Sequence, residues 1–119
     1  KERQRNQLFN GKTLKSRISA IRSMRNNTYH ELVPELLKLV ADASQPLELR
    51  VNTAECLGWF AHTPRRAEII DACRQAAADK NLEKELRDEL TQTAIRLEST
   101  VSELSDDVAP LRDTDTEQS

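Results

Sequence analysis

The sequence predicts an all-α fold, a helical superhelix or solenoid of about two antiparallel helical hairpins followed by a fifth helix. Three observations predict this class. Only 3% of the 119 residues are aromatic and only two are glycine, which disfavours a many-stranded sheet with its frequent turns. Apolar residues recur at steps of three and four along most of the chain, as on one face of an α-helix. Part of this pattern then repeats after 37 residues.

The first quarter of the chain predicts a basic N-terminal segment or partial helix over residues 1–11 and an amphipathic helix over about 13–26. The first segment ends at Asn10-Gly11, a pair that commonly terminates a helix. Thr13 is a suitable N-cap for the second helix, because its hydroxyl can accept a hydrogen bond from a free backbone N–H.

Four further helices are expected at about 31–43, 47–61, 65–79 and 83–103. Pro34 falls in the first turn of its helix, where a missing N–H costs little. The helix at 47–61 carries two adjacent apolar stripes. We therefore expect it to have neighbours on two sides.

Internal repetition is the strongest sign of architecture. A shift of 37 residues superimposes the helix at 31–43 on the helix at 65–79, and Leu49-Arg50 on Leu86-Arg87. A weaker shift of 36 residues aligns two further pairs, Ala54 with Ile18 and Leu57 with Ile21. A period in this range is typical of an α-solenoid, in which each helical hairpin buries its apolar face against the next.

Two stretches of the central hairpin, PELLKLVAD at 34–42 and LRVNTAECLG at 49–58, resemble the HEAT or HEAT-like repeat family. The second is similar to the family's LRxxAAxxLG helix, with Asn52-Thr53-Ala54 in place of a more alanine-rich centre. The resemblance spans about residues 13–97 and is best over 31–62. It implies a helical-repeat module that presents a rigid surface to another protein.

The resemblance also implies a ladder of acid–base pairs along the stacked loops, here Asp42 with Arg50 and Asp79 with Arg87. The alternative is that each Asp is a helix C-terminal residue and each Arg a solvated charge. Exposed pairs of this kind would contribute only about 0–1 kcal/mol each.

The formal net charge of −2 is a cancellation between regions. Residues 1–25 hold eight bases and one acid, which gives +7, whereas the other 94 residues hold 10 bases and 19 acids, which gives −9. We expect three parts: the segment 1–11, a HEAT-like domain at 12–104, and a disordered acidic tail at 105–119, which is too polar to offset its ordering entropy. Two hairpins are fewer than the three or so that a repeat array needs, so we expect the chain to be a segment of a longer protein.

Residues with reactive side chains form no motif that predicts catalysis. Cys56 and Cys73 lie on apolar stripes of adjacent helices and are expected to be buried, inert thiols. His30 and His62 lack the spacing of metal ligands, and no phosphate-binding glycine loop is present. We therefore expect no catalytic site, no cofactor and no metal, and no apolar stretch is long enough to span a membrane. The sequence indicates neither compartment nor oligomeric state.

Two groups of residues are candidates for binding a protein partner or a neighbouring domain of the same chain. Trp59, Arg65 and Arg66 form the first, because an amphipathic Trp at the edge of a repeat can anchor a partner; alternatively, Trp59 packs over an inter-repeat loop. Arg22 and Arg25 form the second group. The expected function is thus that of a non-catalytic interaction or scaffold module. One alternative is an accessory domain of a larger enzyme. Another is binding of nucleic-acid phosphates through the basic helix at 12–25, which we consider the weaker interpretation because no aromatic residues are interleaved with the basic ones.

Overall fold

The computed structural model describes the backbone of residues 1–112 and the side chains of residues 1–99. All regular structure in this part of the chain is helical, which confirms the all-α prediction. The elements are α1 (Glu2–Asn10), α2 (Leu14–Ser23), the short 3₁₀-helix η1 (His30–Leu32), α3 (Val33–Ala41), α4 (Leu47–Leu57), α5 (Arg66–Ala77) and α6 (Lys84–Arg112).

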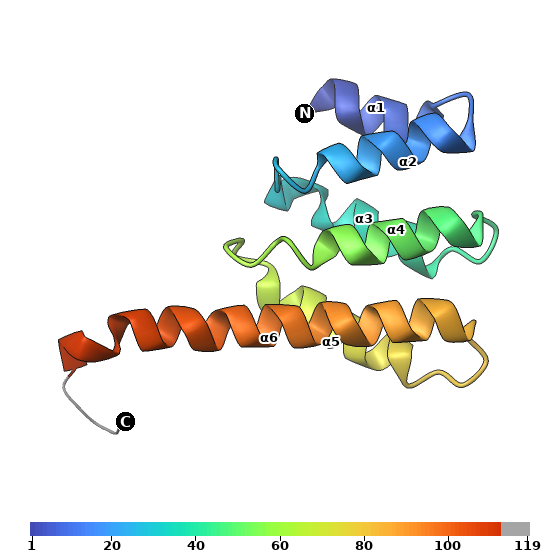
Figure 1. Ribbon diagram of the computed structural model, residues 1–119. Coiled ribbons are helices and arrows are strands. Elements are labelled where there is room, and N and C mark those ends of the chain that lie inside the picture. The colour runs from blue at the N-terminus through green and yellow to red at the C-terminus, as the bar shows by residue number, and fades with distance from the viewer. Residues whose placement is uncertain (113–119) are drawn as a thin grey trace.

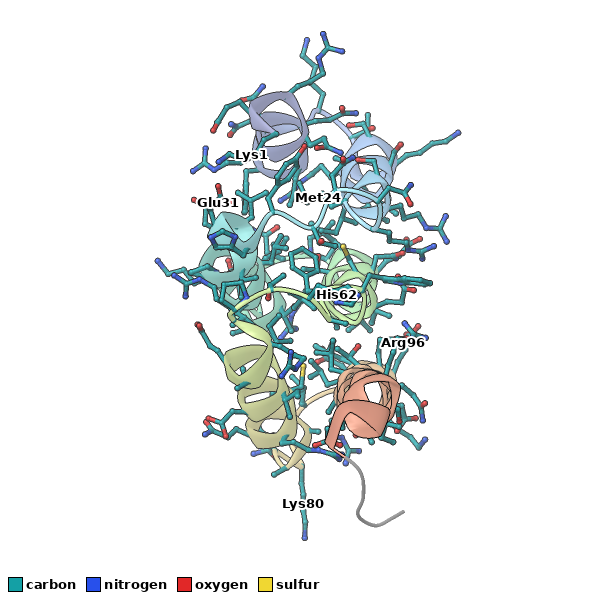
Figure 2. The ribbon with its side chains drawn as sticks, turned by 90° about the vertical axis from the view of Figure 1, so that its left-hand side faces the viewer. Lys1, Met24, Glu31, His62, Lys80 and Arg96 are labelled. Carbon is teal, nitrogen blue, oxygen red and sulfur yellow. The ribbon has the colours of Figure 1, made fainter. Side chains whose placement is uncertain are left out.

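The α-helices pair as three hairpins, α1–α2, α3–α4 and α5–α6, which stack one on another (Figure 1). Seen along the helices, α1, α3 and α5 form one layer and α2, α4 and α6 form the other (Figure 2). Packing between neighbouring hairpins is closer in the layer of α2, α4 and α6, where α4 contacts both of its neighbours extensively, than in the other layer, where α3 and α5 make fewer contacts. The expectation that the helix near 47–61 has neighbours on two sides is confirmed.

The N-terminal segment is more complete than the partial helix expected over residues 1–11. α1 is a helix of nine residues that packs against α2. Its Leu8 is fully buried, and the carbonyl oxygen of Leu8 accepts a hydrogen bond from Arg17 Nε at 2.6 Å. The described chain therefore contains three hairpins instead of two hairpins and a fifth helix.

The last helix is longer than the range 83–103 expected for it. α6 continues to Arg112, so residues 105–112, assigned above to a disordered tail, are helical. The sequence offers a reason, since the apolar residues Val108 and Leu111 continue the spacing of four and three beyond Leu104. Residues 113–119, the rest of the expected tail, lie outside the described residues.

The core is one apolar cluster that runs through all three hairpins. Every α-helix contributes at least one fully buried large side chain, among them Leu8, Ile21, Leu36, Leu49, Ile69 and Leu86. A buried polar contact also crosses between hairpins, because Thr93 Oγ1 of α6 donates to the Ala54 carbonyl oxygen of α4 at 2.7 Å. This bond and the apolar contacts fix the hairpins against one another.

The fourth residue of each second helix is an arginine that binds a backbone carbonyl of its own hairpin. The Nε–oxygen distances are 2.6 Å for Arg17 to Leu8, 2.8 Å for Arg50 to Val40 and 3.1 Å for Arg87 to Leu82. The first two carbonyls lie in the last turns of α1 and α3, where they have no partner within the helix. These equivalent arginines are separated by 33 residues between the first and second hairpins and by 37 residues between the second and third. The first offset is about one helical turn shorter than the 36 residues expected from the sequence.

The Asp–Arg ladder implied by the resemblance does not form as ion pairs among the described residues. Asp42 instead accepts hydrogen bonds from the hydroxyl of Ser44 at 2.6 Å and from its backbone N–H at 3.0 Å, and these lower the pKa of Asp42. Asp79 likewise accepts from the Asn81 N–H at 2.9 Å. Both aspartates close their own turns, as short acidic side chains commonly do, while the arginines bind carbonyl oxygens.

Ion pairs join the first hairpin to the second at a constant sequence separation of 30 residues. The N–O distances are 3.1 Å for Lys1–Glu31, 2.7 Å for Arg5–Glu35 and 2.7 Å for Arg25–Glu55. Figure 2 shows Lys1 of the first hairpin near Glu31 of the second. Part of the positive charge of residues 1–25 is therefore paired within the fold.

Candidate interaction surface

Trp59 lies on the surface of the layer formed by α2, α4 and α6, just after α4 ends at Leu57. Its backbone N–H donates to the Cys56 carbonyl oxygen at 3.0 Å and continues the last turn of the helix. The side chain is 48% exposed, the largest exposed fraction of any large hydrophobic residue in the described part of the chain. Helix packing thus presents an aromatic ring to solvent at a fixed place.

The Trp59 ring is held by contacts with Glu55 and Arg96. The indole Nε1 donates to Glu55 Oε2 at 3.1 Å, one helical turn earlier in α4. The guanidinium carbon of Arg96, in α6, lies 5.3 Å from the ring centroid, within the range of a cation–π interaction. Arg96 Nη1 also lies 3.8 Å from Glu55 Oε2.

Glu55 extends this arrangement to the first hairpin. Its Oε1 accepts from Arg25 Nη2 at 2.7 Å and from Arg25 Nε at 3.0 Å, a contact through two nitrogens of one guanidinium. We call Arg25, Glu55, Trp59 and Arg96 the Glu55 cluster. It contains residues from all three hairpins, and its central carboxylate is only 22% exposed.

Gly58 allows Arg96 to approach α4 closely. A Cβ atom at this position would lie 3.1 Å from Arg96 Nη1 and 3.2 Å from the Glu55 carbonyl oxygen. Both distances are tighter than ordinary van der Waals contact, so the guanidinium would have to shift by a few tenths of an ångström to admit a side chain here. The close approach of Arg96 favours glycine at this position, the residue after α4, whereas its φ of −66° is open to any residue.

Glu89 of α6 places a second carboxylate beside the Glu55 cluster. Burial raises the pKa of Glu89, and the nearby negative charge of Glu55 raises it further, while Arg96 and Arg25 act in the opposite direction. The seam between α4 and α6 therefore carries both signs of charge around the exposed indole.

Arg65 and Arg66 are placed apart from the residues that hold Trp59. Arg65 Nη1 pairs with Glu68 at 2.9 Å, and Arg66 Nη1 donates to the Ala61 carbonyl oxygen at 3.2 Å. Within the described side chains, no hydrogen bond, ion pair or ring contact joins either arginine to Trp59. Arg66 instead fixes the connection that leads into α5.

The second predicted group is divided by the fold. Arg25 joins the Glu55 cluster, whereas Arg22 is exposed on α2 beside a groove between α2 and α4. The groove is lined by Leu14, Lys15, Ile18, Ser19, Arg22 and Glu48. The structure thus brings Trp59 and Arg25 together through a carboxylate and leaves Arg22 at a separate site.

The candidate residues predicted from the sequence did not include Glu55 or Arg96. Helical spacing does place Glu55 beside Trp59, because it stands four residues earlier and positions four apart are neighbours on a helix surface. Arg96 gave no such signal. Its position beside Trp59 depends on how α6 packs against α4, which local spacing does not define.

The remaining candidate chemistry is confined to buried thiols and solvent-exposed histidines. Cys56 and Cys73 are free and buried, as expected, and burial raises the pKa of Cys56 to about 12 and that of Cys73 to about 11. His30 Nδ1 lies 3.8 Å from Glu31 Oε1, and His62 is exposed. In the described part of the chain, no three His, Cys, Asp or Glu side chains come together as metal ligands.

No helix in the described range is long and apolar enough to cross a membrane. Comparison with family models, with curated proteins and with solved structures finds no match to this chain.

Proposed function

We propose that this chain is a HEAT-like helical-repeat module that binds a protein partner, without catalysis, through the surface of α2, α4 and α6. The stacked hairpins support the solenoid part of the proposal, since each hairpin buries one face against its neighbour. The arginines at the fourth position of α2, α4 and α6 support it too, because the same contact recurs in every hairpin.

The observation that carries the binding proposal is that Trp59 is half exposed and yet held in place by contacts with Glu55 and Arg96. Tryptophan and arginine are enriched among the residues that dominate protein–protein binding energy. A side chain already ordered before binding loses little conformational entropy in the complex, which favours its use as an anchor.

Binding of nucleic-acid phosphates through residues 12–25 has less support than protein binding. Arg25 is paired with Glu55, and Arg17 is engaged by a carbonyl oxygen. The neighbouring helix α4 presents Glu48 and Glu55 toward the same surface, and such carboxylates repel a polyanion.

Site-specific photo-crosslinking in cells provides a test with an internal control. A benzophenone amino acid is placed at Trp59 in one variant and at Ile95 in another. Ile95 is the matched control, because it is the other exposed large hydrophobic residue among the described side chains, 42% exposed in α6, and it is not one of the residues of the Glu55 cluster. We expect a discrete adduct from position 59 and none of the same mass from position 95.

The crosslinked protein is then purified and its affinity measured for the native chain and for Trp59→Ala. Loss of a central Trp should weaken binding by about 2 kcal/mol or more, close to thirtyfold. Equal adducts from both positions, or equal affinity of the Trp59→Ala chain, would show that Trp59 is not the anchor of the binding site.

A further inference from the structure

The groove between α2 and α4 has an apolar floor and a basic edge. Leu14 and Ile18 are partly exposed at its base, and Lys15 and Arg22 stand exposed beside them. Within the described side chains, neither Lys15 nor Arg22 takes part in an ion pair, unlike Lys1, Arg5 and Arg25 of the same hairpin; Glu48 is the one acid along the groove. Such a groove fits a segment that combines apolar side chains with negative charge.

The chain contains a segment of that chemistry. Residues 103–119 hold six acids and one base, a net charge of −5 by subtraction. Their apolar residues Leu104, Val108 and Leu111 are spaced by four and three, the spacing with which an amphipathic helix presents anchors to a groove. The negative charge of the segment therefore matches the basic edge of the groove, and its spaced apolar residues match the apolar floor.

The geometry of α6 separates this segment from the groove of the same molecule. α4 and α6 run in the same direction (Figure 1), and their 11 and 29 residues correspond to lengths of about 16 and 43 Å. The end of α6 thus projects about 27 Å past the end of α4, and α2 lies two helix spacings of roughly 9 Å away. Residues 113–119 span at most about 25 Å when fully extended, which is too short for a return to α2.

We propose that residues 103–119 of one copy of this chain dock in the α2–α4 groove of a second copy. The apolar residues of the segment contact Leu14 and Ile18, and its carboxylates pair with Lys15 and Arg22. Groove and segment are different surfaces of the chain. When each of two copies places its segment in the groove of the other, the pair is a closed symmetric dimer with two such contacts. A nucleic acid is a poorer occupant, because its phosphates gain nothing from the apolar floor.

Sedimentation velocity of the full chain over a concentration series up to about 1 mM tests the proposal, since contacts of this size bind weakly. We expect a reversible dimer that weakens as salt is added, because exposed charges are screened. The double variant Lys15→Glu, Arg22→Glu should weaken the dimer by about tenfold or more. The control Arg3→Glu, Lys12→Glu has the same change in charge at exposed positions away from the groove and should dimerise like the native chain.

A charge swap makes the test specific for the segment. The variant Asp106→Lys, Asp107→Lys should also lose dimerisation, and a mixture with the Lys15→Glu, Arg22→Glu variant should regain it. The proposal is overturned by a chain that stays monomeric to 1 mM, by a dimer that neither pair of reversals weakens, or by a mixture that does not recover.

The proposed dimer and the proposed binding of a partner at Trp59 can be tested independently. Trp59 does not line the α2–α4 groove. The Trp59→Ala chain should therefore dimerise normally, whereas loss of the dimer would leave the crosslinking result at position 59 unchanged.

Discussion

Replacement of Arg50 by methionine tests whether the arginines that bind carbonyl oxygens stabilise the stack. Arg50 is only 3% exposed, and its Nε donates to the Val40 carbonyl oxygen at 2.8 Å. Methionine retains an apolar stem of similar length but cannot donate a hydrogen bond. The variant therefore leaves a buried carbonyl oxygen at the end of α3 without its charged partner.

The expected cost follows from these contacts. A hydrogen bond to a charged group contributes about 1.5–3 kcal/mol. The second contact, from Arg50 Nη1 to Glu83 at 3.6 Å, adds little, because the Glu83 carboxylate is exposed. We therefore expect Arg50→Met to lower the free energy of unfolding by about 2 kcal/mol, a large part of the 5–15 kcal/mol that a typical domain possesses.

Urea unfolding followed by far-UV circular dichroism measures this effect. With a slope of about 1–3 kcal/mol per molar urea, the midpoint should fall by about 1 M at an unchanged slope. Arg65→Met is the matched control. Among the described side chains, Arg65 forms an ion pair with Glu68 alone, which is exposed, so the midpoint of this variant should stay close to that of the native chain. A loss below about 0.5 kcal/mol in Arg50→Met, no larger than a surface substitution causes, would refute the stabilising role of the carbonyl contact.

Three further substitutions or reactions probe the core and the seam between α4 and α6. Burial and the negative charge of Glu55 raise the pKa of Glu89, so the ionised form of Glu89 opposes folding at neutral pH. Glu89→Gln should therefore raise the melting temperature at neutral pH. A gain that persists below about pH 4.3, the ordinary glutamate pKa, would show that the ionised carboxylate is not the cause. Thr93→Val removes a buried hydrogen bond between α6 and α4 and should cost about 1 kcal/mol in urea unfolding, whereas an unchanged midpoint would show that the bond is dispensable. Cys56 and Cys73, whose raised pKa values keep the thiols protonated, should react with a thiol reagent only after unfolding; rapid reaction in the native chain would show that they are accessible.

The helical fold could be predicted because its signals are local. Apolar spacing located α2, α3, α4 and α5 within a few residues and gave the start of α6, although not its end at Arg112. The two apolar stripes near 47–61 showed that this helix has neighbours on both sides. The first hairpin was underestimated, since α1 has a single buried residue, Leu8, and thus almost no apolar stripe. Its pairing with α2 depends on contacts between helices, among them the bond from Arg17, which no helical period reveals.

The candidate surface could be predicted only in part for a related reason. The sequence left open whether Trp59 is an exposed anchor or packs over an inter-repeat loop, and the structure shows it 48% exposed. The residues of the Glu55 cluster come from three hairpins, so the surface depends on how the hairpins align. The sequence predicted an offset of 36 residues between the first two hairpins, whereas the structure has 33, an error of about one helical turn. The predicted neighbours Arg65 and Arg66 are close to Trp59 in sequence, but a turn and the start of α5 separate them from it.

The Glu55 cluster makes the proposed binding surface a property of the stack. Arg25 belongs to the first hairpin, Glu55 and Trp59 to the second, and Arg96 to the third, so no single hairpin can order the indole in this way. A partner that selects the ordered indole binds the stacked state in preference to any state with separated hairpins. By linkage, such binding stabilises the packing of α2, α4 and α6, and substitutions that loosen the stack weaken binding even when they do not touch the partner.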